Sequence, residues 1–104
     1  MHVSAIDMSY TRLNKNKGYI VTQVTIVDEA GSPVSGATVD LLMDLPGGGT
    51  ASGSADTDDG IATFSLRISN SATGDYTSTV TGVTHATLAY EAGDNIKTSE
   101  TFTY

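Results

Sequence analysis

Apolar and polar residues alternate along short stretches of this chain, and this period of two restricts its fold more than any other feature. The clearest example covers residues 61–68, and its apolar side chains are Ala62, Phe64, Leu66 and Ile68. Successive side chains of a β-strand point to opposite faces, so an extended strand places all of these on one side. We therefore expect a strand here with one face on a core.

Comparable runs, rich in Thr, Val and Ile, recur along the chain between turns that contain Gly, Pro, Asn or Asp. β-Branched residues favour strands, and these breakers favour turns. The runs predict strands over residues 2–10, 19–28, 37–45, 61–68, 76–83 and 96–104. A seventh, weaker edge strand is expected over residues 50–55, and no stretch predicts a helix. Many short strands with regularly spaced turns indicate an all-β antiparallel sandwich of about seven strands.

The alternation also predicts which side chains face the core. Those expected are Ile6, Met8 and Tyr10 in the first strand, Ile20, Val24 and Ile26 in the second, Val39, Leu41 and Met43 in the third, and Ile96, Phe102 and Tyr104 in the last. In the turn before the third strand, Gly31 is expected to adopt a positive φ, and Pro33 fixes its own φ.

Length, charge and cysteine content limit the classes of protein to consider. A chain of 104 residues has room for one core, so residues 1–104 are expected to form a single domain. The formal net charge of -7 disfavours nucleic acid and anionic membranes as partners. The chain has no Cys, which excludes disulfides and thiolate metal sites. No apolar run approaches a membrane span or a signal peptide, and we expect a module excised from a longer chain.

Several segments resemble the immunoglobulin-like modules of bacterial and archaeal surface proteins. They are residues 24–28, 31–39, 57–64 and 76–81, together with the looser match at 90–95. The chain is similar to the repeats of invasin- and intimin-type adhesins and to the modules appended to secreted subtilisin-like proteases. The Gly-x-Pro-Val-x-Gly-Ala pattern of residues 31–37 also occurs in transthyretin-like and collagen-adhesin B-type modules. The resemblance implies an immunoglobulin-like β-sandwich that serves as a stalk, spacer or adhesion module.

No set of residues in the sequence predicts catalysis. A nucleophilic triad needs a histidine base, and only His2 and His85 are present, without a Gly-x-Ser-x-Gly motif. Carboxylate pairs that cleave glycosides work in sugar-lined clefts, and the chain has no Trp to stack on a sugar. We therefore expect a protein that is not an enzyme, with no catalytic, cofactor-binding or metal-binding residues.

The segment Asp56-Thr57-Asp58-Asp59-Gly60 carries carboxylates in a pattern that suits Ca²⁺. An EF-hand loop would continue to a glutamate six residues after its glycine, where this chain has Leu66. The alternative is a hairpin turn in which Asp side chains accept hydrogen bonds from backbone N–H groups, and this is the favoured interpretation.

The other unusual residues have structural explanations. Residues 46–50 form a glycine-rich connector without the lysine of a phosphate loop, and Arg12, Lys15 and Lys17 form a basic turn that favours solubility. Tyr76 enters its strand where sandwich domains place a corner tyrosine, whose hydroxyl bonds to the backbone.

The functional prediction is a non-catalytic structural or adhesion module of a secreted or cell-surface protein. The alternative is a carbohydrate- or calcium-binding accessory domain attached to an extracellular enzyme. The expected partners are neighbouring domains and a cell-surface protein or glycan, with no nucleic acid and no membrane insertion, and the isolated module is expected to be monomeric. Seven alternating strands would make the first and last point the same way, so the ends would lie at opposite poles of a rod roughly 35 Å long.

Overall fold

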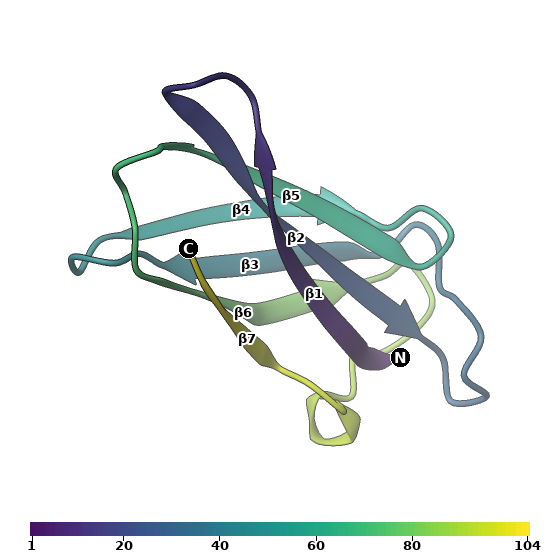
Figure 1. Ribbon diagram of the computed structural model, residues 1–104. Helices are drawn as coiled ribbons and strands as arrows, with labels where there is room; N and C mark the ends of the chain where they lie inside the picture. The colour runs from purple at the N-terminus through teal and green to yellow at the C-terminus, as the bar shows by residue number, and fades with distance from the viewer.

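The computed structural model describes all 104 residues, and seven strands make up its regular structure. The strands are β1 (His2–Arg12), β2 (Lys17–Val27), β3 (Thr38–Asp44), β4 (Thr50–Asp56), β5 (Ile61–Ser69), β6 (Asp75–Thr84) and β7 (Ser99–Thr103). They form two antiparallel sheets, in the orders β1-β2-β5 and β4-β3-β6-β7, which face each other (Figure 1). The predicted all-β, immunoglobulin-like sandwich is therefore confirmed.

The weak edge strand predicted over residues 50–55 is a full member of the second sheet. A tight turn joins it to β3. Within this turn the Leu45 N–H bonds to the Gly49 carbonyl at 2.8 Å. Seven residue pairs, from Thr38 with Asp56 to Asp44 with Thr50, then align β4 with β3. In constant-type immunoglobulin domains the fourth strand belongs to the sheet of the first strand. Here the short turn keeps β4 beside β3, so the sheets have three and four strands.

The last strand is shorter than predicted. The sequence predicts a strand from residue 96, but β7 begins at Ser99, and Ile96 is 76 % exposed instead of facing the core. The segment before β7 is an irregular loop with a 3-10 turn, η1 (Ala92–Asp94). Polar groups hold this loop: the Asn95 side chain accepts from the Val3 N–H at 2.7 Å, and the Ile96 N–H bonds to the Val3 carbonyl at 3.0 Å. These bonds fix the backbone and leave the Ile96 side chain outside.

The core fills the space between the sheets in two clusters. The larger cluster includes Ile6, Val24, Ile26, Val39 and Leu41, and the smaller one is formed by Ile20, Met43, Ile68 and Tyr76. The predicted inward faces of β2 and β3 are thus confirmed. In β1 the register shifts between Val3 and Ala5, and both Val3 and Ile6 are buried because this irregularity interrupts the alternation.

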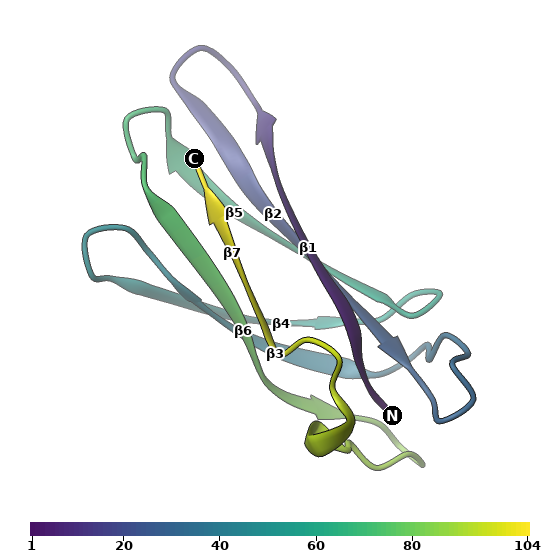
Figure 2. The ribbon, with the colours of Figure 1, turned by 60° about the horizontal axis from the view of Figure 1, so that its bottom comes forward.

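The two ends of the chain lie at opposite ends of the molecule (Figure 2). The amino group of Met1 bonds to the Ala89 carbonyl at 2.9 Å, beside the end of β2. The ring of Tyr104 stacks on Tyr10, near the far end of β1, with ring centroids 4.3 Å apart. The molecule measures 43 × 23 × 18 Å, somewhat longer than the expected rod. The arrangement predicted from strand parity is confirmed.

Candidate functional site

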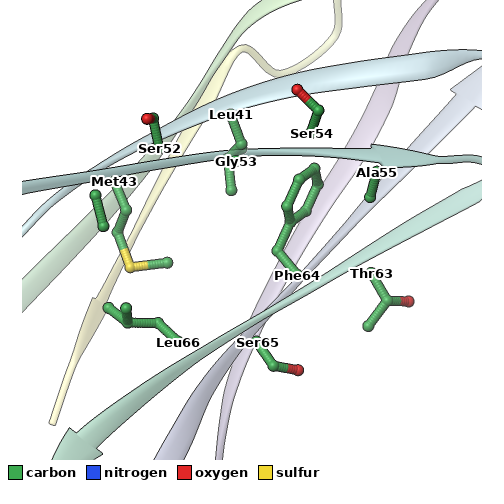
Figure 3. A pocket seen from close by; sticks show the side chains of 11 residues that line it. Leu41, Met43, Ser52, Gly53, Ser54, Ala55, Thr63, Phe64, Ser65 and Leu66 are labelled. Carbon is green, nitrogen blue, oxygen red and sulfur yellow. The ribbon is translucent and has the colours of Figure 1, made fainter.

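A groove opens between the free edges of the two sheets, where β4 and β5 lie side by side (Figure 3). Its volume is about 260 Å³, and it is lined by Leu41, Met43, Ala51, Ser52, Gly53, Ser54, Ala55, Thr63, Phe64, Ser65 and Leu66. The apolar face of β5 that the sequence predicted forms one wall. At this groove, apolar side chains that point toward the space between the sheets are partly exposed to solvent.

The groove exists because β4 is built from small residues. Alanine, serine and glycine alternate along it, and they are too short to cover the side chains of β5. Phe64 extends from β5 toward Gly53 and remains half-buried, as does Leu66 (Figure 3). A Cβ atom at Gly53 would lie 3.8 Å from the Phe64 ring, so the ring already fills the space that a larger β4 side chain would need.

The lining residues carry no titratable group, which restricts what the groove can do. Its centre is apolar, with the ring of Phe64 and the side chains of Met43 and Leu66, while the side chains of Ser52 and Ser54 point away from this centre on the other side of β4 (Figure 3). The Ser54 hydroxyl donates to the Asp40 carboxylate at 2.5 Å. The centre of the groove can therefore bind a ligand through apolar contact. The outer edge of β4 has no partner strand, so its backbone groups can also bond to a ligand.

Neither histidine lines this groove, and neither forms an ion pair with a carboxylate. His85 lies in the exposed loop after β6, where its Nδ1 accepts from the Thr87 and Leu88 N–H groups at 3.1 and 3.2 Å. Its Nε2 lies 3.2 Å from the Ser35 carbonyl. The ring therefore organises a loop. His2 begins β1 and pairs with Val27.

The Asp56–Gly60 segment forms the tight turn that the sequence favoured. Asp59 has φ 51° and Gly60 has φ 84°, and Asp58 bridges to Ile61. The predicted bonding is wrong in one respect: the buried Thr57 side chain, and not an Asp side chain, bonds to the backbone, and it ties the turn to the connection between β2 and β3. Its hydroxyl donates to the Val34 carbonyl at 2.6 Å and accepts from the Ala37 N–H at 3.0 Å. No cluster of three His, Asp or Glu side chains is arranged to hold a metal.

Tyr76 has the corner role that the sequence predicted. It is 1 % exposed, and its hydroxyl donates to the Ala72 carbonyl at the entry to β6. Burial raises the pKa of Tyr76, because the charged phenolate would lose its hydration. Tyr10 is also structural, since its hydroxyl donates to the Asn70 side chain at 2.9 Å.

Sequence reasoning missed the asparagines and the aspartate that hold the loops. Asn70 connects the β5–β6 loop to Tyr10 and to the Lys15 carbonyl, and Asn95 anchors the long loop to β1. Asp28 accepts from the Ala30 and Ser32 N–H groups, each at 2.9 Å. Only Asp28 had a readable signal, because Asp at the start of a Gly-containing turn favours this local bonding.

No protein-family model, no curated protein and no solved structure matches this chain. The resemblance to prokaryotic immunoglobulin-like modules therefore stays a prediction. The fold rests on the structure itself, in which no helix is long and apolar enough to span a membrane.

Proposed function

We propose that this domain is a non-catalytic spacer in a secreted or cell-surface protein, holding the segments that flank it apart. The observation that carries the proposal is the position of the chain ends at opposite ends of a molecule 43 Å long. A segment that enters at Met1 and leaves at Tyr104 is displaced along the long axis. Function does not follow from a sandwich fold alone, so the proposal depends on this geometry.

The way in which the ends are held also supports a spacer. β1 pairs with β2 from His2 to Arg12, and Tyr104 exchanges two backbone hydrogen bonds of 2.9 Å with Gly74. These inter-strand bonds run across the strands, so tension along the chain loads many of them together in shear. A domain built in this way resists extension.

A fusion of two copies joined directly tests the spacer role. Small-angle X-ray scattering should show that the second copy increases the maximum dimension by about the 43 Å length of the domain. The matched control replaces the second copy by a flexible Gly/Ser segment of equal residue number, which should contribute a broad distribution of distances. A fusion whose copies fold back side by side would contradict the proposal.

A second candidate is a carbohydrate-binding accessory domain, favoured by the groove between β4 and β5. Phe64 offers a ring, and the free edge of β4 offers backbone N–H and carbonyl groups beside it. Aromatic faces and backbone hydrogen-bonding groups can recognise sugars. A glycan array followed by NMR titration tests this. Binding should disappear in Phe64→Ala and persist in Phe102→Ala, which alters a half-buried ring on β7; a ligand that shifts only resonances outside the groove would exclude this site.

A further inference from the structure

The tip of the β1–β2 hairpin and the loops at the opposite end of the molecule carry charges of opposite sign. The hairpin between β1 and β2 ends in exposed Arg12, Lys15 and Lys17, which we call the basic tip. The loops at the other end, near Met1, carry Asp28, Glu29, Asp58, Asp59, Glu91 and Asp94. The net charge of -7 is therefore unevenly distributed along the 43 Å axis.

None of these end charges has an ion-pair partner within the chain, although Arg12 donates to the Asn14 carbonyl at 3.2 Å and Asp28 accepts from two backbone N–H groups. The single ion pair joins Lys97 to Glu100 at 2.8 Å, and the hydrogen bond from Lys97 lowers the pKa of Glu100. The cations of the basic tip and the opposite carboxylates thus meet no opposite charge within the chain and can pair with those of another molecule.

Apolar surface accompanies the charge at both ends. At the basic tip, Leu13 is 48 % exposed between the basic residues. The opposite end contains a recess of about 440 Å³, which we call the acidic recess. It is lined by Met1, Ala30, Leu88 and Ala89 and by the acidic Asp28, Glu29 and Glu91. One end is an apolar side chain flanked by cations. The other is an apolar hollow bordered by three carboxylates, whose negative charge exceeds that of the single Met1 amino group bonded to the Ala89 carbonyl.

The basic tip is held in a fixed shape before any contact. The Asn14 side chain accepts from the Asn16 and Lys17 N–H groups, each at 2.9 Å. The neighbouring β5–β6 loop supports the tip through Asn70, whose side chain donates to the Lys15 carbonyl and whose N–H bonds to the Asn16 carbonyl at 2.9 Å. A preformed tip loses little conformational entropy on binding.

We propose that the basic tip of one copy docks in the acidic recess of a second copy, head to tail. Leu13 enters the hollow beside Leu88, and Arg12 and Lys15 approach the carboxylates of Asp28 and Glu29. The contact uses different surfaces on the two partners, so it leaves a free end on each and can continue into an open chain. At 0.1 M salt, interactions between charges more than about 10 Å apart are largely screened. The repulsion between two molecules of the same net charge is therefore weakened, while the attraction between the tip and the recess remains.

The inference does not depend on the spacer role, because it concerns two surfaces of one chain in solution. It also changes the expectation that the isolated module is always monomeric. The contact is small and belongs to the weak class of interfaces, so association requires a high protein concentration. Sedimentation velocity at millimolar protein in about 0.1 M salt should show a sedimentation coefficient that rises with concentration. In about 0.5 M salt the coefficient should return to the monomer value.

Charge exchange between two variants gives the decisive test. The recess variant is E29K/E91K, which keeps Asp28 because its carboxylate holds the loop that lines the recess. This variant and the tip variant R12E/K15E/K17E should each remain monomeric, because the tip and the recess of each variant then carry charges of the same sign. An equimolar mixture should associate again, because each variant then offers the complement of the other. D7K and T101E change net charge at mid-length on exposed positions and should leave association unchanged. Thermal midpoints confirm that each variant is folded.

Leu13→Ser tests the apolar part and should weaken association several-fold without changing its salt dependence. A wild-type chain that stays monomeric under these conditions would overturn the proposal. So would association that both charge variants retain, or a mixture of folded variants that stays monomeric.

Discussion

A buried pair of hydroxyls joins the two sheets, and replacing it gives a sharp test of the packing. Thr22 on β2 and Ser78 on β6 are both 0 % exposed, and their side-chain oxygens lie 2.9 Å apart. They separate the two apolar clusters, because Ile20 and Tyr76 belong to one cluster while Val24 and Val80 belong to the other. Each hydroxyl is the other's hydrogen-bond partner, and no buried side-chain nitrogen or oxygen atom lacks a hydrogen-bond partner.

Thr22→Val should destabilise the domain although it keeps the shape of the side chain. It leaves the Ser78 hydroxyl buried without this partner, which costs about 1–3 kcal/mol. For a domain of this size, that corresponds to a thermal midpoint lower by about 5–15 °C. Ser78→Ala should act similarly. The double variant Thr22→Val/Ser78→Ala removes both polar groups and should lie within about 1 kcal/mol of the wild type.

Urea unfolding of the four proteins measures the coupling directly, provided that the slope m stays constant. We expect a coupling free energy of about 1 kcal/mol or more. Thr77 and Thr101 provide a matched control, because their hydroxyls also lie 2.9 Å apart but on the exposed outer face. Water can replace that bond, so the control cycle should show little coupling. Additive losses at Thr22 and Ser78 would refute the reasoning.

Four further substitutions test other parts of the structure. Gly31 has φ 83°, as the sequence predicted, and Gly31→Val should lower the free energy of unfolding by at least about 1 kcal/mol in a denaturant titration. Gly60→Ala should lower the free energy of unfolding more than Gly31→Ala does. A Cβ atom at residue 60 would lie 2.7 Å from Pro33, whereas a Cβ atom at residue 31 would have no atom within 4 Å. Equal losses of stability would contradict this. Phe64→Ala should cost less than the 3–5 kcal/mol typical of a fully buried Phe, because Phe64 is only half-buried; a larger loss measured by urea unfolding would place it in the core. The pKa of Tyr76 is raised in the folded state, so above pH of about 10 the unfolded chain loses its Tyr76 proton more readily than the folded domain. The free energy of unfolding should therefore fall as pH rises above about 10. Tyr76→Phe should make the thermal midpoint less sensitive to pH in that range.

The strands could be predicted from the sequence because their alternation reflects burial directly. Val39, Leu41 and Met43 face the core as the period of two requires. The partner of β4 could not be predicted, because Ala51, Ser52 and Gly53 have little preference for either face. The short turn before β4 determines its sheet, and that choice opens the groove beside β5.

The last loop shows the opposite limit. Ile96 fits the alternation of the strand that follows, yet its N–H bonds to the Val3 carbonyl, and the neighbouring Asn95 side chain accepts from the Val3 N–H. A bond between residues so far apart in sequence leaves no local signal. The acidic recess is also assembled from distant segments, so its match with the basic tip becomes visible only in the folded chain.

The separation of the two chain ends is the central claim, and a distance between spin labels measures it most directly. The chain has no cysteine, so labels on His2→Cys and Thr103→Cys are the only ones present. Residues 2 to 10 of β1 rise about 3.3 Å each, which predicts a narrow distribution of distances centred at about 25–35 Å. A centre near the ~10 Å spacing of packed sheets would place both ends at one pole and contradict the proposed spacer.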